Sequence, residues 1–316
     1  MLHLIPKTLY LKECSLYNPG WIFYFLSYYA RCRFGGKRIP LLAGFKLTHK
    51  CNLRCMHCPF WKNHDGTMLA FEQVKNTMER LHLLGVRILI LEGGEPLLWR
   101  DGDFGLKEVI KEAKKLFYSV GVTTNGTLPL TINPHTIWVS IDGMKETNDR
   151  IRGETFDAVC NNIQQSSHPN ILANITINRL NYQEIPDLTR FLNGKVKGIT
   201  IQFNYPYEKD DDLCLMFHER REVLDQLIRL KAQGFPISDS FECLRALKEN
   251  SWKCEDWMLA NAEPDGKINL GCYVKNRGAI NCNLCGFAAH AEISFGYQLM
   301  LNPILAGMRI FRYGCN

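Results

Sequence analysis

The 316-residue sequence lacks any long hydrophobic run. Its most apolar stretch, Trp21 to Ala30, is ten residues long, well short of the roughly 18 that a membrane-spanning helix needs. The first ten residues contain only a brief apolar run without a small-residue cleavage site, so we expect no secretory signal. Internal repeats and low-complexity segments are absent, and 22% charged residues is ordinary for a folded protein. These features predict a folded, cytoplasmic protein.

Acidic residues are scarce near the N-terminus. Residues 1–40 contain six lysines and arginines but only one acid, Glu13, whereas the net charge of the whole chain is +6. The rest of the chain is therefore nearly neutral, which argues against a broad nucleic-acid surface, and we expect no DNA partner. Six aromatic residues lie between Trp21 and Tyr29. This segment predicts either a helix packed on the main domain or an anchor that contacts a membrane peripherally.

Cysteine, by contrast, is abundant. Thirteen cysteines, an odd number in a long chain, favour metal-bound thiolates in a reducing compartment over a disulfide framework. Five of them have no partner at a metal-binding spacing, and we expect these to be structural: Cys14, Cys32, Cys160, Cys214 and Cys315.

Short apolar runs alternate with amphipathic stretches through most of the chain. Strands are expected over residues 44–48, 86–91, 119–124, 137–141, 171–177 and 198–203. Helices are expected over residues 70–84, 105–116, 155–165, 183–192 and 218–233. The alternation predicts an α/β fold, a partial (β/α)6 TIM-like barrel over residues 41–240, with its active site at the carboxyl ends of the strands. Residues 1–40 form an aromatic and basic segment before it, and residues 241–316 form a small Cys-rich domain after it.

The first chemical motif follows the first predicted strand. Cys51, Cys55 and Cys58 have the spacing C-x3-C-x2-C. Three thiolates on one loop can hold three irons of a [4Fe–4S] cluster and leave the fourth iron open to another ligand. From the spacing alone, a structural zinc loop or three unrelated cysteines remain as alternatives.

The second motif follows the second predicted strand. Gly93, Gly94, Glu95 and Pro96 form a turn in which two glycines let the backbone approach a ligand closely. Such a turn is weak evidence alone but strong evidence one βα unit after the cysteine loop.

With these two motifs in this order, the sequence resembles the radical S-adenosylmethionine (SAM) enzymes. The resemblance covers residues 43–240 and extends through Thr123–Thr127, Val139–Gly143 and Asp149–Gly153. Asn148 stands where relatives often have histidine.

The resemblance implies roles for individual residues. Cys51, Cys55 and Cys58 would ligate the SAM-binding [4Fe–4S] cluster. The Gly93–Pro96 turn would bind the SAM amino group, mainly through its backbone, and His57 would lie against the adenine. Polar residues at later strand ends would reach the rest of SAM: Thr124, Asn125, Ser140 and Asn178. Asp142 is a candidate catalytic contact, although Asp-Gly is also an ordinary turn signal.

A second cysteine group lies near the C-terminus. Cys254-x17-Cys272 followed by Cys282-x2-Cys285 is similar to the shortened auxiliary-cluster domains, of the twitch or SPASM type, that follow some radical SAM barrels. We expect an auxiliary [4Fe–4S] cluster held by these four thiolates. Zinc, or a ligand set that includes Cys243, is the alternative.

The resemblance implies reductive cleavage of SAM to a 5′-deoxyadenosyl radical, with a reductant such as ferredoxin or flavodoxin. A lipid or isoprenoid is our first expectation for the substrate, because of the aromatic, basic N-terminal segment and the apolar run Leu299–Phe311. The C-terminal cysteines also distantly resemble those of enzymes that join adenosyl to hopanoid precursors. A peptide or protein substrate is the second expectation, and tRNA or a nucleotide-derived small molecule is the third.

Overall fold

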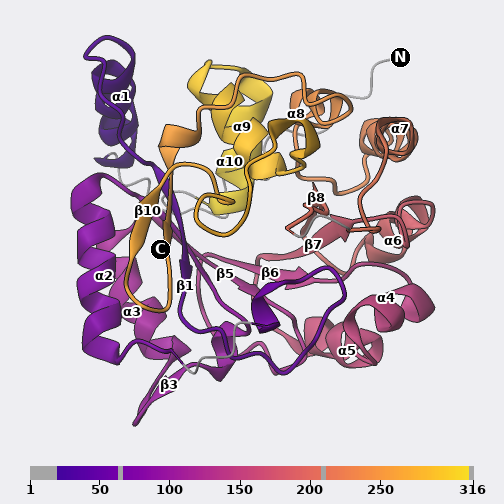
Figure 1. Cartoon of the computed structure of the whole chain (residues 1–316), viewed down its shortest axis with the longest axis horizontal. Coiled ribbons are helices and arrows are strands. Elements are labelled where there is room, and N and C mark those ends of the chain that lie inside the picture. The colour runs from indigo at the N-terminus through magenta and orange to yellow at the C-terminus, as the bar shows by residue number, and fades with distance from the viewer. Residues whose placement is uncertain (1–19, 63–66, 208–210, 313–316) are drawn as a thin grey trace.

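The computed structural model describes residues 20–62, 67–207 and 211–312 (Figure 1). Cys14, Cys315 and the first half of the predicted N-terminal segment lie outside these ranges. The α-helices are α1 (Gly20–Arg33), α2 (Phe71–Leu84), α3 (Leu106–Leu116), α4 (Lys145–Arg152), α5 (Phe156–Gln165), α6 (Ile185–Leu192), α7 (Phe217–Ala232), α8 (Phe241–Ala246), α9 (Ala288–Tyr297) and α10 (Leu301–Phe311). Short 3-10 helices are η1 (Phe60–Lys62), η2 (Pro96–Leu98), η3 (Asp256–Met258) and η4 (Cys282–Leu284).

A curved sheet of eight strands forms the frame of the molecule, in the order β10-β9-β1-β2-β5-β6-β7-β8. The strands are β1 (Leu42–Lys46), β2 (Ile88–Glu92), β5 (Ser119–Thr124), β6 (Thr136–Ser140), β7 (Ile171–Ile177), β8 (Gly198–Phe203), β9 (Leu259–Ala262) and β10 (Ile268–Leu270), and a separate hairpin pairs β3 (Arg100–Asp101) with β4 (Phe104–Gly105). Every neighbouring pair from β9 to β8 is parallel, and β10 is antiparallel to β9. The predicted α/β partial barrel is confirmed.

The two faces of the sheet differ because side chains alternate along each strand. Phe45 and Leu91 belong to the main hydrophobic core together with Val74 and Met78 of α2, on the outer, helix-covered face. Figure 1 shows α2 to α7 placed around the outside of the curved sheet. The alternate residues, such as Lys46 and Glu92, face inward, so the interior at the carboxyl ends of the strands is polar.

The C-terminal segment contributes to the barrel itself. Strand β9 extends the sheet beside β1, in the register Leu42↔Leu259. Helix α9 contacts both β8 and η3, the element before β9, so it lies across the opening between the two edges of the sheet. The predicted boundary at residue 240 stays a prediction, but two strands beyond it are hydrogen-bonded into the barrel sheet.

Helix α10 closes the amino-terminal end of the barrel. The Ser119 hydroxyl donates to the Phe311 carbonyl at 2.6 Å, and the Thr136 hydroxyl donates to the Ile310 carbonyl at 2.6 Å. Trp138 packs on Ile310 inside this end. Figure 1 shows α1 and α8 to α10 gathered at one end of the molecule. The opposite end, where the strands terminate, is left for the chemical motifs.

Helix α1 has two unlike faces. Tyr28 and Cys32 are buried in a cluster with Leu42 and Met258, and the Tyr28 hydroxyl donates to the Ile39 carbonyl at 2.8 Å. Its inner face thus packs on the main domain. Its outer face exposes apolar side chains: Ile22 at 40%, Phe23 at 69% and Leu26 at 64%. An interfacial role for this face stays a prediction.

Candidate active site

The cysteine loop follows β1 at the carboxyl edge of the sheet. Cys55 is buried, whereas Cys51 and Cys58 are half-buried. The loop folds on itself, because the Leu53 amide donates to the Cys51 sulfur at 3.4 Å and the Cys58 amide donates to the Cys55 carbonyl at 3.2 Å. One end of α4 holds it from outside through the Met56 amide, which donates to the Ile151 carbonyl at 2.9 Å. The loop therefore has one defined shape.

The three thiols of this loop lie close enough to interact electrostatically. Burial raises the pKa of the Cys55 thiol to about 11, with smaller contributions from the charges of Asp142, Cys58 and Cys51 and an opposing one from Arg152. Burial also raises the pKa of Cys51. Such thiols need a metal or a cation to stabilise their thiolates. Three such thiolates could hold three irons of a [4Fe–4S] cluster and leave the fourth iron open.

The Gly93–Gly94 turn packs directly against the cysteine loop. A Cβ atom on Gly93 would lie 2.8 Å from the Thr48 carbonyl oxygen, and one on Gly94 would lie 2.4 Å from the Lys50 carbonyl oxygen. The Gly94 amide donates to the Thr48 carbonyl at 2.6 Å. Only glycine fits this approach, so the two motifs identified in the sequence form one unit in the fold.

The Glu95 carboxylate joins this unit to the end of β5. It accepts hydrogen bonds from the Thr124 hydroxyl at 2.8 Å, the Asn125 amide at 2.7 Å and the Leu97 amide at 3.0 Å. The side chain is fully buried, and burial raises its pKa although the hydrogen bonds oppose the shift. Its carboxylate is thus occupied with the protein, which leaves backbone groups of the turn to contact a ligand. Pro96, the first residue of η2, is also buried.

Thr124 and Asn125, which were expected to contact SAM, lie at the end of β5 beside the cysteine loop. The Asn125 side-chain amide donates to the Asn52 carbonyl oxygen at 2.8 Å and lies 4.0 Å from the Cys51 sulfur. Ser140 ends β6 and is half-buried. Asn178 is fully buried, and its side chain bonds within its own turn, accepting from the Leu180 amide at 2.9 Å. Asn181 of the same turn donates to the Asp142 carbonyl at 2.6 Å, and a contact of Asn178 with SAM stays a prediction.

His57 and Asp142 meet beside the loop. The His57 Nε2 lies 3.8 Å from the Asp142 carboxylate, and burial lowers the pKa of His57. Asp142 is fully buried, and its carboxylate accepts from Arg152 at 2.6 Å and from the Thr176 amide at 2.7 Å. Because both oxygens are occupied, Asp142 holds other groups in place in this structure. Its catalytic role stays a prediction.

Arg152 is a site residue that the sequence reasoning did not select. Burial lowers its pKa, but the charges of Asp142, Cys55 and Cys58 outweigh burial and raise it. Its guanidinium therefore lies near two of the three thiols. Asn148, at the position where relatives often have histidine, accepts from the Asp142 amide at 3.1 Å. The available signal was the stretch Asp149–Gly153, which was noted only as a resemblance.

A second charged group faces the barrel interior. The Lys46 ammonium is buried, donates to Glu92 at 2.7 Å and to the Tyr273 hydroxyl at 2.5 Å, and lies 4.3 Å from the Phe60 ring centre. Arg277 stacks on Tyr273 with its guanidinium 4.0 Å from the ring centre. This group connects β1 to the Cys-rich segment, because Tyr273 follows Cys272.

The four C-terminal cysteines also converge. Burial raises the pKa of Cys254 to about 12, with smaller contributions from the charges of Cys285, Asp256, Cys272 and Cys282. Cys254 and Cys282 are exposed, so the group lies at the surface. Sequence reasoning missed His290, whose Nδ1 lies 3.9 Å from the Cys254 sulfur and whose ring is buried against Phe287.

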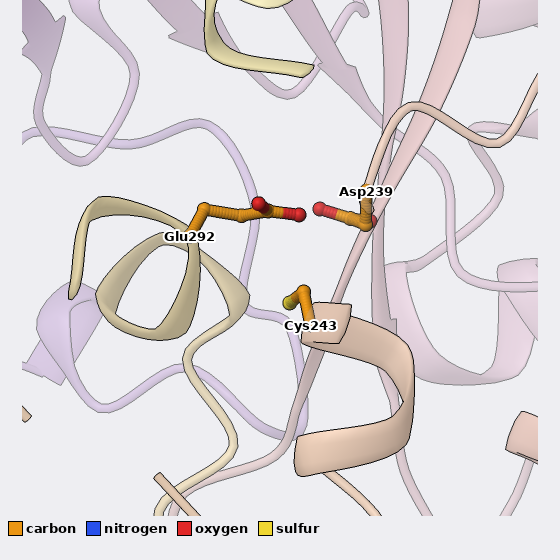
Figure 2. Close-up of side chains that lie close together, drawn as sticks. All are labelled: Asp239, Cys243 and Glu292. Atoms are coloured by element: carbon orange, nitrogen blue, oxygen red, sulfur yellow. The ribbon is translucent and has the colours of Figure 1, made fainter. Parts of the chain in front are cut away.

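A separate acidic cluster lies away from these motifs. The carboxylates of Asp239 and Glu292 point toward one another, with the Cys243 thiol beside them (Figure 2). Burial raises the pKa of Asp239 to about 7 and that of Glu292 to about 8. The Cys243 thiol lies 3.6 Å from the Ala288 carbonyl oxygen, to which it donates. Each of these three residues offers one possible metal-ligating atom, and the three atoms lie within 4.8 Å of one another. Within the described ranges, it is the group of candidate ligands that meets this distance.

Comparison with known proteins identifies the domain that carries the site. The model of the "Radical SAM superfamily" matches residues 45–192, which include the cysteine loop, the glycine turn and the strand ends described above. These residues form a radical SAM domain. A protein with this domain is an enzyme, and its cofactors are a [4Fe–4S] cluster and SAM.

Known radical SAM relatives differ in what they do. The chain is 25% identical over 276 residues to Fe-coproporphyrin III synthase of Methanosarcina barkeri, covering 76% of this chain and 67% of that one. It is 32% identical over 168 residues to the sporulation killing factor maturation protein SkfB of Bacillus subtilis, covering 48% of this chain and 39% of that one. The chain therefore spans two thirds of the first relative and about two fifths of the second.

Solved structures support the fold. SuiB of Streptococcus suis, in a crystal structure bound to the precursor peptide SuiA, matches with a TM-score of 0.63 at 14% identity, over 84% of this chain and 67% of that one.

In the ranges that the structure describes, no helix combines the length and the apolar character that crossing a bilayer requires.

Proposed function

We propose that this radical SAM enzyme binds its SAM-cleaving cluster through Cys51, Cys55 and Cys58 and modifies its substrate with the 5′-deoxyadenosyl radical. The observation that carries this assignment is the contact between the two motifs, in which Gly94 lies against the Lys50 carbonyl of the cysteine loop. Backbone groups of the turn thus lie directly beside the thiols. When bound, the reduced cluster transfers one electron to SAM, which splits into methionine and the radical.

The surrounding residues hold this arrangement in place. Arg152 places a positive charge beside the Cys55 and Cys58 thiolates and lowers the pKa of Cys55. Glu95 fixes the glycine turn to Thr124 and Asn125, which places these polar groups beside Cys51. The polar residues of the barrel interior then orient the substrate near the radical and exclude water.

We also propose an auxiliary [4Fe–4S] cluster on Cys254, Cys272, Cys282 and Cys285. The charges of Cys272, Cys282 and Cys285 contribute to the raised pKa of Cys254, so the four thiols lie close enough to share one metal group.

Iron analysis separates the two sites. The reconstituted wild-type protein should contain about eight irons, whereas the triple variant of Cys51, Cys55 and Cys58 to Ala should retain about four. The triple variant should also form no 5′-deoxyadenosine under dithionite reduction. Cys160→Ala, which removes a half-buried thiol on α5, is the control and should change neither value. A triple variant that still cleaves SAM would contradict the assignment, and one with zinc in place of iron would contradict the auxiliary cluster.

A peptide is the substrate class that two of the reported relatives favour. SkfB is named as a maturation protein, and SuiB was solved with a precursor peptide. We therefore propose that a peptide enters at the carboxyl ends of the strands. Deuterated extracts of the source organism, divided into peptide and lipid fractions, test this proposal. A peptide substrate predicts deuterium transfer into 5′-deoxyadenosine from the peptide fraction, whereas transfer from the lipid fraction alone would contradict it.

A membrane lipid or isoprenoid is the second candidate, and the outer face of α1 is the observation that favours it. Phe23 and Leu26 are exposed there, and exposed Arg31, Arg33 and Lys37 lie on the same segment. Tyr29 lies 5.8 Å from Tyr297, measured between ring centres, which places the end of α9 beside α1. Aromatic and basic side chains together suit the surface of an anionic bilayer.

Co-sedimentation with vesicles tests this membrane contact. The protein should bind vesicles that contain phosphatidylglycerol at low salt and should dissociate as salt increases. Phe23→Ser with Leu26→Ser should abolish binding, whereas Leu83→Ser, which removes an 84%-exposed leucine from α2, should not. Equal binding by both variants would contradict a role for α1.

We further propose that the one-electron donor is a small acidic protein such as ferredoxin or flavodoxin.

A further inference from the structure

A cavity of about 560 Å³ lies at the amino-terminal end of the barrel, remote from the strand ends that carry the cysteine loop. Its walls come from the starts of β7 and β8, the end of α7, the start of α8 and one side of α10. The volume falls within the range of about 300–1,000 Å³ that small-molecule sites occupy. The mechanism proposed above makes no use of this space.

Four cations line the cavity, namely Lys197, Lys231, Arg309 and Arg312. Of the described residues in the lining, none is acidic. None of the four cations forms an ion pair with another described residue, although thirteen ion pairs elsewhere among the described residues involve lysine or arginine. Clustered cations without counter-charges repel one another, and an anion would remove that cost.

Lys231 shows most clearly how burial and a neighbouring cation disfavour the positive charge. Its ammonium donates to the Ile237 carbonyl at 2.6 Å. Burial and the charge of Arg309 lower its pKa, while Asp239 and Glu292 behind the cavity wall oppose the shift. Those two acids compensate only in part near neutral pH, because burial raises the pKa of both carboxyls.

The helix ends explain only part of this pattern. Arg309 and Arg312 lie at the end of α10 and Lys231 lies in the last turn of α7, where the carbonyl ends of helices favour cations. That preference does not account for Lys197, which precedes β8, or for the convergence of all four on one hollow.

The rest of the lining is apolar and aromatic. Phe235, Phe241 and Leu305 contribute surfaces against which a ring or an alkyl chain can lie. We propose that this cavity binds an organic phosphate, with the phosphate among the four cations and the organic part on the aromatic side chains. Lysine and arginine are the residues that recognise phosphate, and the aromatic walls distinguish an organic phosphate from a simple ion.

The phosphate could belong to a free nucleotide or to a lipid headgroup, and the probes distinguish the two. The wild-type holoenzyme is titrated in a calorimeter with AMP and with monomeric dihexanoyl phosphatidic acid. At least one of these two probes should bind saturably, and its binding should weaken as salt increases. AMP binding alone identifies a free nucleotide, and phosphatidic acid binding alone identifies a headgroup.

Charge removal completes the test. Lys197→Gln with Arg309→Gln changes two exposed side chains outside the catalytic machinery and should weaken binding at least tenfold. Lys107→Gln with Lys111→Gln removes the same charge from exposed positions on α3 and should leave the Kd within about twofold. Absence of binding of both probes up to millimolar concentration, or equal losses in the two double variants, would overturn the proposal. Because SAM cleavage is measured separately, this failure is distinct from failure of the proposed function.

Discussion

The contact between the glycine turn and the cysteine loop predicts a sharp effect of one methyl group. In Gly94→Ala, the new Cβ would lie 2.4 Å from the Lys50 carbonyl oxygen and 2.5 Å from that of His49. Both neighbours are backbone atoms, so no side-chain rotation can relieve the clash. The cysteine loop or the turn must move by about 1 Å to reach ordinary contact, at a cost of about 1–3 kcal/mol.

That cost can be measured in two ways. The melting temperature should fall by about 2–4 °C for each kcal/mol lost. Because the displaced loop carries the three thiols, SAM binding and 5′-deoxyadenosine formation should fall more than tenfold even in variant protein that retains its iron. Gly307→Ala is the control, since nothing lies within 4 Å of its new Cβ and alanine favours a helix such as α10. A Gly94→Ala protein with wild-type SAM affinity and melting temperature would refute the reasoning.

Three further predictions concern other contacts. Arg152→Lys keeps the positive charge but loses the planar guanidinium that donates to Asp142. We therefore expect SAM cleavage, measured as 5′-deoxyadenosine, to fall about tenfold. Activity equal to wild type would show that the charge alone suffices. His290→Phe removes the ring nitrogen 3.9 Å from the Cys254 sulfur, so the potential of the auxiliary cluster should fall in a spectroscopic redox titration, whereas an unchanged potential would contradict this contact. For Glu292→Gln, the raised pKa values mean that the folded wild type holds protons that the unfolded chain releases near pH 4, so wild-type stability falls progressively as pH rises from about 4 to about 8. The stability of the variant relative to wild type should therefore increase by on the order of 3 kcal/mol between pH 5.5 and pH 8.5 in guanidinium unfolding, and a constant difference would contradict the shared-proton interpretation.

Much of the barrel was predictable because its strands are short apolar runs between turn residues. The expected ranges for β5, β7 and β8 match the structure to the residue. Strand β1 was expected at 44–48 but lies at Leu42–Lys46, because the buried run continues past the strand into Leu47 and Thr48. Helix α4 was not expected, since its buried residues include Asn148 and Arg152 and it lacks an apolar stripe.

The site was predictable in its local parts and not in its long-range ones. Cysteine spacing and the glycine turn are written in neighbouring residues, so both motifs could be read from the chain. The bond between Lys46 and Tyr273 joins positions 227 residues apart, and no periodic pattern encodes it. Asn178 illustrates a second limit, since a polar residue at a strand end can also bond within its own turn, and its contact with SAM stays a prediction.

The pairing of β9 with β1 also has a consequence for biosynthesis. Strand β1 emerges from the ribosome early, but its partner on one side is not translated until residues Leu259–Ala262. Until then, the strand that leads into the cysteine loop has an unpaired edge, which invites misassembly with other chains. Cluster insertion into a finished barrel must therefore wait until residues Leu259–Ala262 have been made. Nascent chains halted before residue 259 should depend on chaperones far more than completed ones.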